Sequence, residues 1–189
     1  MPWKSNILQI GLRSKRRMES RFIVLAAFLF FCWPVSYVRA DQQQWSRYTN
    51  SRFGASAEVP RGIFVALPEP DNGSGLGFRS VDGRASMTIR GNWVSNTAPN
   101  FRSLMPILVE EARERGSIVT FKSSGNGWFA YSGYAKSRIF YHKVVTGCPN
   151  QTVANSMDIE YDVSARSFYD PIVARISKSM TSLSSAECP

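Results

Sequence analysis

The sequence has few of the residues on which most enzyme active sites depend. Its 189 residues include a single histidine, His142, and three cysteines, with no Cys-x-x-Cys pair. Metal sites and dithiol redox sites need such residues at close spacing, so both are disfavoured. The glycines at positions 73, 75 and 77 match neither G-x-G-x-x-G nor the P-loop pattern, and a strand rather than a helix follows them. We therefore predict no catalytic motif, cofactor or metal site.

The protein also has little excess charge once its first forty residues are set aside. The whole chain has a formal net charge of +9, but residues 1–40 hold seven Lys or Arg and one Glu. Residues 41–189 hold 16 Lys or Arg and 13 Asp or Glu, which leaves +3, with no basic run. Nucleic-acid binding depends on clustered positive charge that neutralises phosphates. We therefore predict no nucleic-acid partner.

The first forty residues have the three parts of a secretory signal peptide. Lys15, Arg16, Arg17 and Arg21 precede an unbroken apolar run over residues 22–33, which Pro34 interrupts. Residues 38–40 form an A-x-A-like end. The pattern predicts cleavage near Ala40, a mature chain that begins at Asp41, and a periplasmic or secreted location.

Two alternatives stay open at the N-terminus. The first is an uncleaved membrane anchor over residues 22–38, which is at the short end of the length that spans a bilayer. Pro34 and Ser36 weaken the last turn of such an anchor. We predict contact with the membrane only in this case. The second is translation from Met18, which leaves Arg21 as the only basic residue before the apolar run.

Two cysteines, Cys148 and Cys188, follow the predicted cleavage site. An even number of cysteines in an exported chain predicts a disulfide, here between a loop and the last residues of the chain. Residues 41–189 have the usual length of one domain and contain no linker, repeat or low-complexity segment. We therefore predict a single domain over residues 41–189.

Alternating and short apolar segments predict several strands. The Asp82-Gly83 pair is a strong hairpin signal between residues 76–80 and 84–94. In the second of these segments Ala85, Met87 and Ile89 share one face, which is typical of a sheet with one wet face. The other predicted strands are a hairpin over 45–60, a short run over 63–67, and segments 118–122, 128–134, 138–145 and 156–163.

Two segments predict helices. In residues 104–115 the apolar residues recur every three or four positions, with Ser103 as the predicted cap and Pro106 in the first turn. The second helix is predicted to start at Asp170-Pro171, a cap followed by proline at the first helical position, and its apolar stripe extends to Leu183. Together the segments predict an α+β fold, with two helices on a mostly antiparallel sheet of about six strands.

Several segments resemble a known family. Residues 48–54, together with Val59-Pro60 at the end of the following strand, resemble the opening hairpin of exported bacterial proteins with a PsbP-like (Mog-like) α-β-α sandwich. Three further pieces resemble one uncharacterised branch of these proteins: the loop 71–78 with Asp82-Gly83 after it, the strands around 128–133 and 139–141, and the start of the last helix at 169–171. The resemblance implies the sandwich fold and an accessory or binding role, and it implies no activity.

A hydrolase is the main catalytic alternative, and it depends on His142 as the base. Ser132 and Ser137 are the nearest candidate nucleophiles along the chain, but neither lies in a G-x-S-x-G turn. A single histidine in a strand is more often a packed or hydrogen-bonded side chain.

Acidic and aromatic residues give two further candidate surfaces. Asp158, Glu160 and Asp162 point the same way along one strand, too far apart to chelate one ion, so pairing with Lys143 or an arginine is expected. Most aromatic side chains of the central strands are predicted to be core. The remaining candidates for a ligand-binding face are Trp93, Tyr134, Tyr141 and His142.

The sequence thus favours an exported, non-catalytic binding or accessory module that contacts an unknown envelope protein or small ligand. The alternatives are a small periplasmic hydrolase using His142 and a purely structural envelope component.

Overall fold

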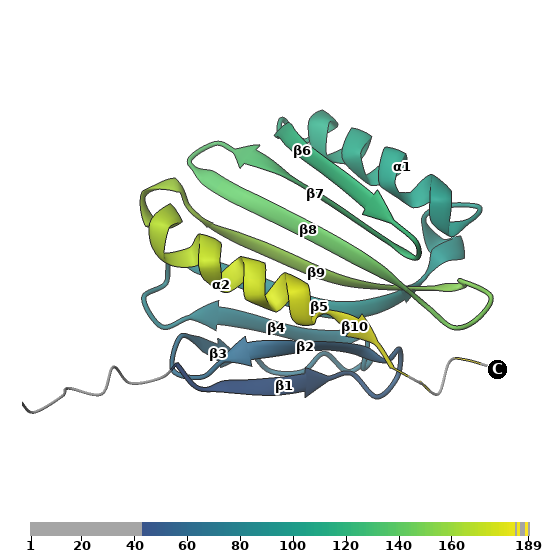
Figure 1. Cartoon of the computed structure of the whole chain (residues 1–189), viewed down its shortest axis with the longest axis horizontal. Helices are drawn as coiled ribbons and strands as arrows, with labels where there is room; N and C mark the ends of the chain where they lie inside the picture. The colour runs from purple at the N-terminus through teal and green to yellow at the C-terminus, as the bar shows by residue number, and fades with distance from the viewer. Residues whose placement is uncertain (1–42, 184, 186–187, 189) are drawn as a thin grey trace, which may run out of the picture. The chain divides into compact units, whose positions relative to one another are not determined.

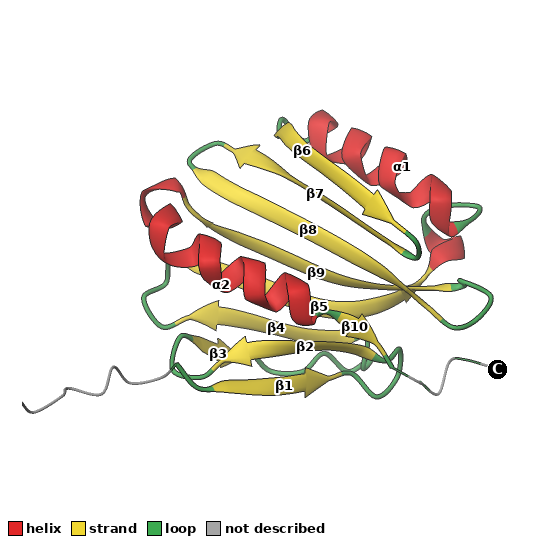
Figure 2. Cartoon of the chain, in the orientation of Figure 1, coloured by secondary structure: helices red, strands yellow, loops and turns green. Residues whose placement is uncertain are grey.

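The computed structural model describes residues 43–183, 185 and 188, and the predicted signal peptide lies outside these residues. These described residues form five strands, a helix, four strands, a second helix and a last short strand, in that order (Figure 2). The strands are β1 (Trp45–Thr49), β2 (Ala55–Pro60), β3 (Phe64–Ala66), β4 (Gly75–Ser80), β5 (Ala85–Trp93), β6 (Ile118–Gly125), β7 (Trp128–Ala135), β8 (Arg138–Gly147), β9 (Val153–Asp162) and β10 (Thr181–Ser182). The helices are α1 (Phe101–Glu114) and α2 (Arg166–Ser179), with short 3-10 turns at Val94–Asn96 and Val163–Ala165.

Seven strands form the main sheet in the order β3-β4-β5-β9-β8-β7-β6, and all neighbours are antiparallel. A second sheet has the order β1-β2-β10. The predicted α+β class, with two helices on an antiparallel sheet, is confirmed. The main sheet has seven strands, and the short apolar run predicted over 63–67 forms its edge strand β3, which pairs with β4.

The core lies on both faces of the main sheet. On one face, α2 and β2 pack on β5 and β9, with fully buried side chains such as Ile89, Met157 and Ile176. On the other face, Leu104, Val109 and other residues of α1 pack on β7 and β8. Figure 1 shows α2 crossing the sheet near β8 and β9, while α1 runs beside β6 and β7. The sheet is therefore the middle layer of a sandwich.

Both helices begin earlier than the sequence predicted. Asn100, not Ser103, caps α1, because its side chain accepts a hydrogen bond from the Ser103 backbone N–H. The second helix begins at Arg166, so Asp170 and Pro171 lie inside it rather than at its start. It ends at Ser179, and the chain then forms β10 on β2 instead of continuing the helix to Leu183.

The last residues of the chain are held by a covalent link. Cys148, after β8, is joined by a disulfide to Cys188, with the two Cα atoms 5.2 Å apart. Nearby, the Nδ2 of the fully buried Asn155 donates hydrogen bonds to the Phe53 carbonyl and to Ser182 Oγ. The tail, the second sheet and the main sheet therefore meet at one place. Among the described residues, no helix is long and apolar enough to cross a membrane.

Candidate functional site

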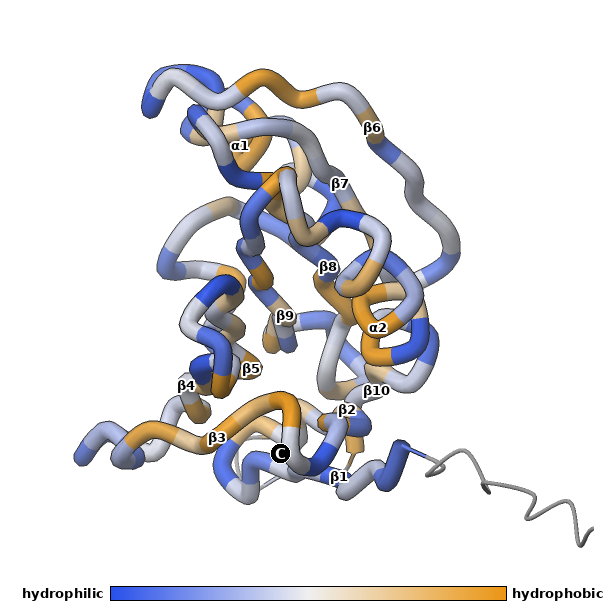
Figure 3. Tube along the Cα trace, turned by 90° about the vertical axis from the view of Figure 1, so that its left-hand side faces the viewer, coloured by the Kyte–Doolittle hydropathy of each residue, from blue (hydrophilic) through white to orange (hydrophobic). Residues whose placement is uncertain are grey.

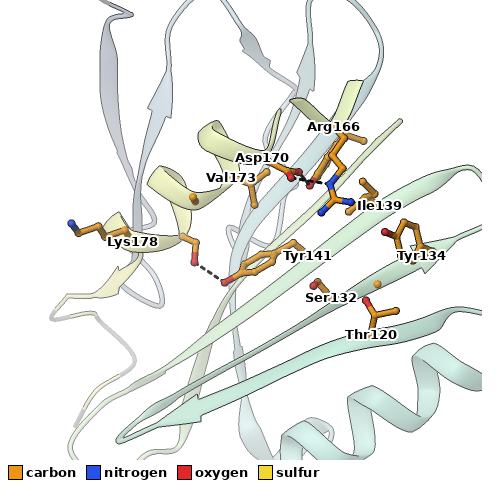
Figure 4. Close-up of a pocket in the computed structure, with 13 residues that line it drawn as sticks. Thr120, Ser132, Tyr134, Ile139, Tyr141, Arg166, Asp170, Val173 and Lys178 are labelled. Carbon is orange, nitrogen blue, oxygen red and sulfur yellow. Dashed lines mark hydrogen bonds and ion pairs between the residues drawn. The ribbon is translucent and has the colours of Figure 1, made fainter. Parts of the chain in front are cut away.

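A groove lined by thirteen residues lies between α2 and the strands β6, β7 and β8. It has a volume of about 510 Å³, which is within the range of small-molecule sites. It exists because α2 packs over β8 and β9 and leaves the β6–β7 side of the same face uncovered (Figures 1 and 4). Hydroxyl groups are frequent in its lining: Thr120, Ser132, Tyr134, Tyr141, Tyr161 and Ser177.

One end of the groove is fixed by bonds between β8 and the C-terminal half of α2. The hydroxyls of Tyr141 and Ser177 are 2.8 Å apart, and Lys143 Nζ donates to the Ser177 carbonyl at 2.6 Å. Figure 4 shows Tyr141 reaching from the strand to the helix. Partial burial lowers the pKa of Lys143 below its ordinary value. These two contacts join the C-terminal half of α2 to β8 and define this end of the groove.

The other end is formed by a hydrogen-bonded group on the first turns of α2. Tyr161 donates from its hydroxyl to one oxygen of Asp170 at 2.6 Å, and Arg166 Nε donates to the other at 3.0 Å. Burial, with the hydrogen bond and negative charge of Asp170, raises the pKa of Tyr161. Both oxygens of the Asp170 carboxylate therefore already accept hydrogen bonds, and the positive charge of Arg166 offsets the negative charge of Asp170. A ligand in the groove meets mainly hydroxyl groups and aromatic rings.

The four residues predicted to form a ligand face do not form one surface. Tyr134 and Tyr141 both line the groove. His142 follows Tyr141 in the same strand and therefore points to the opposite face, under α1. Trp93 lies edge-on to Phe53, with ring centroids 6.0 Å apart, and lines a separate hollow of about 280 Å³ beside the start of α1.

His142 is a buried residue with one satisfied ring nitrogen. Its Nδ1 donates a hydrogen bond to Asp158, its ring lies 4.9 Å from that of Tyr131, and its Nε2 is buried without a hydrogen-bond partner in the described part of the chain. Ser132 cannot serve as its nucleophile, because Ser132 lines the groove on the opposite face. Ser137 lies in the turn between β7 and β8, at the far end of the strand.

The acidic stripe of β9 is paired with arginines rather than with Lys143. The ion pairs are Arg90–Asp158 at 3.7 Å, Arg138–Glu160 at 3.5 Å, Arg138–Asp162 at 3.1 Å and Arg84–Asp162 at 3.5 Å. The described residues contain no group of three or more His, Cys, Asp or Glu that is placed to hold a metal ion. The stripe is therefore best explained as cross-strand charge pairing.

Within the acidic stripe, the ionised form of Asp158 is stabilised by several neighbouring side chains. Its burial favours the neutral acid, but His142, Arg90 and the Ser156 hydroxyl all favour the carboxylate and together hold the pKa of Asp158 below its ordinary value. A carboxyl group with a lowered pKa in the folded state stabilises the fold above its unfolded pKa, and this stability is lost as the pH falls through the folded pKa. The His142–Asp158 pair is thus a structural contact of the sheet in neutral solution.

Sequence reasoning missed the α2 side of the groove. Asp170 was predicted as a helix cap, whereas it is a hydrogen-bond acceptor for Tyr161 and Arg166. The i,i+4 spacing of Arg166 and Asp170 was the one available signal, since such pairs meet on a helix surface. Thr120 and Ser132 gave no signal, because they are accessible only where α2 covers β8 and β9 and leaves β6 and β7 open.

Comparison with known structures agrees with this architecture. No protein-family model and no curated protein matches the sequence. The chain is similar to the solution structure of cyanobacterial PsbP (CyanoP) from Synechocystis sp. PCC 6803, with a TM-score of 0.54, 12% identity, and coverage of 82% of this chain and 99% of that one. The Ran-binding protein Mog1p of Saccharomyces cerevisiae gives a TM-score of 0.49 at 9% identity, over 74% of this chain and 96% of that one. The first similarity confirms the PsbP-like fold; we draw nothing from the second.

Proposed function

We propose that this chain is a non-catalytic binding or accessory module, and that the groove between α2 and β6–β8 is its binding site. The observation that carries this proposal is the separation of the groove from the only histidine. Tyr134 and Tyr141 line an open groove with hydroxyl groups, while His142 lies on the other face of the sheet. A groove with aromatic rings and a few polar groups is typical of a binding site.

A tryptophan in place of Ser132 tests the groove. Ser132 lies on the groove floor, so an indole there is expected to fill the space and abolish ligand binding. The measurement is thermal unfolding in the presence of a panel of sugars, amphiphiles and peptides. A compound at about 100 times its dissociation constant adds about 2.7 kcal/mol of stability, which raises the melting temperature of a domain this size by on the order of 5 °C or more.

The matched control is Ser86→Trp, which places the same side chain at an exposed position of β5. We expect the Ser86→Trp protein to keep the full temperature shift and the Ser132→Trp protein to lose it. An equal shift in both variants would show that the ligand binds elsewhere, and the groove would no longer be the candidate site.

The hydrolase alternative has one specific observation in its favour. The hydrogen bond between His142 Nδ1 and Asp158 resembles the orienting half of a catalytic triad, and the buried Nε2 has no hydrogen-bond partner in the part of the chain that the structure describes. The alternative requires a nucleophile that the described residues do not place beside Nε2. Turnover in an esterase, glycosidase or peptidase screen that His142→Ala abolished would favour the hydrolase over the binding module.

We further propose that the module works outside the cytoplasm after removal of residues 1–40. The basic, apolar and A-x-A-like parts of the leader support this, as does the pairing of Cys148 with Cys188, since disulfides persist in oxidising compartments. Intact-mass measurement of the protein recovered from cells is expected to give a chain that begins at Asp41 with both cysteines oxidised. A full-length cytosolic product with free thiols would contradict export.

A further inference from the structure

The strand β6 is both the free edge of the main sheet and one wall of the groove. It is the last strand in the order β3-β4-β5-β9-β8-β7-β6, and six of its eight residues are exposed. Figure 3 shows the strand along the outside of the sheet. The backbone groups on its outer side have no strand partner among the described residues. An edge of this kind can accept an additional strand from another chain.

The part of β6 that follows its bulge is regular. The register shifts between Val119 and Phe121, and from Phe121 to Gly125 each residue has one partner in β7. Five residues of extended chain present an edge of about 17 Å. This is long enough for several hydrogen bonds to an added strand.

The exposed side chains of β6 extend the groove surface. Phe121 is opposite Ser132, and directly paired residues project to the same face, so Phe121 lies beside the groove floor. It is 47% exposed, and Ile118 is 66% exposed. A strand added to β6 would place alternate side chains against these two apolar residues and toward the groove.

The edge half of the sheet carries three lysines that form no ion pair among the described residues. Residues 115–157, which span β6, β7, β8 and the start of β9, contain five Lys or Arg and no Asp or Glu. Arg115 and Arg138 form ion pairs with carboxylates outside this segment. Lys122, Lys136 and Lys143 of this segment form no ion pair among the described residues, and neither does Lys178 of α2. Of these, Lys143 donates to the Ser177 carbonyl. An acidic occupant would complement this charge.

We propose that β6 accepts an extended, acidic segment of a partner protein as an eighth strand, with its alternate side chains over Phe121 and into the groove. This rests on the proposed binding function of the groove and names the class of partner. A second copy of this chain is disfavoured as the occupant, because two β6 edges would bring the same unpaired positive charges together.

The test begins with a random dodecapeptide phage library selected on the purified protein. We expect the recovered peptides to be enriched in Asp and Glu that alternate with apolar residues, as a strand with one face toward the groove requires. A fluorescein-labelled synthetic peptide from this selection then serves as the probe in anisotropy titrations. Recovery of no peptide, or of peptides without acidic enrichment, would overturn the proposal.

Two exposed positions of β6 provide the variants. Phe121→Asp and Lys122→Glu each place negative charge on the edge and are expected to weaken the peptide by about tenfold or more. The matched controls are Val65→Asp on β3, the opposite edge of the same sheet, and Arg79→Glu on β4; both are exposed and are expected to leave the affinity within about twofold. Equal losses in variants and controls would mean general attraction of an anion to a basic protein, and would overturn strand addition.

N-methylation of the peptide tests the backbone bonds without altering the protein. In an antiparallel pair only every second residue bonds to a given neighbour, so methylating one alternate set of amides is expected to weaken binding about tenfold and the other set much less. If neither set matters, strand addition is refuted, whatever the state of the variants. The groove itself is judged separately, because the Ser132→Trp comparison uses the ligand panel and does not depend on the edge.

Discussion

Replacing Gly91 in β5 with alanine is expected to destabilise the folded protein strongly. Gly91 pairs with Asn155 in β9, and a Cβ at this position would overlap the Cβ of Phe53 and lie 2.5 Å from Asn155 Oδ1. Phe53 and Asn155 are both buried, and Asn155 links three parts of the chain. We expect a loss of about 3 kcal/mol in the free energy of unfolding, measured by urea titration.

The matched control is Gly77→Ala in β4 of the same sheet. A Cβ there would lie 3.2 Å from Leu67 Cδ1, the end of a flexible and partly exposed side chain that can move. We expect a change within about 1 kcal/mol, in either direction. If Gly91→Ala changed the free energy of unfolding as little as Gly77→Ala, the β1–β2 turn would not pack closely against β5 at Gly91.

Removing the disulfide is expected to be the second large effect. The bridge between Cys148 and Cys188 has a sequence separation of 40 residues, for which the chain-entropy relation gives up to about 4 kcal/mol. The constraint acts on the unfolded chain, so the effect is large even though Cys188 is near the end of the sequence. For the Cys148→Ser, Cys188→Ser double variant we expect a melting temperature lower by on the order of 10 °C.

Reductant provides the control for this prediction. It is expected to lower the melting temperature of the parent protein toward that of the double variant and to leave the double variant unchanged. A parent protein that melts at the same temperature with and without reductant would show that the bridge does not constrain the chain.

The parts of the fold that the sequence predicts correctly are those marked by short-range patterns. The Asp82-Gly83 turn and the alternation of Ala85, Met87 and Ile89 are short-range signals, and β4 and β5 form where they indicate. The start of the second helix differs from the prediction because Asp170-Pro171 looks like a cap in isolation. In the structure the helix begins at Arg166, four residues before this pair. Tyr169, which precedes the pair, is fully buried against Phe64 and Tyr161, and this packing favours the longer helix.

The candidate site was less predictable than the fold. Tyr134 and Tyr141 were named from their aromatic character, but their shared face follows from the register of β7 on β8, which pairs Ser132 with Tyr141. The sheet register and the position of α2 over β8 and β9 together decide which residues line the groove. Neither can be read from local sequence, which is why Trp93 and His142 were grouped with the two tyrosines. The short β10 was also missed, since its pairing with β2 is between residues distant in sequence.

A partner strand that binds on the β6 side of the groove is expected to shield the backbone of β6 from solvent. Hydrogen–deuterium exchange of the protein, with and without the selected acidic peptide, tests this most directly because it reports backbone protection along the whole chain. We predict slower exchange in residues 118–125 when the peptide is bound, with β3 unchanged. Protection confined to β3 or to the α1 face of the sheet, with residues 118–125 exchanging as in the free protein, would contradict it.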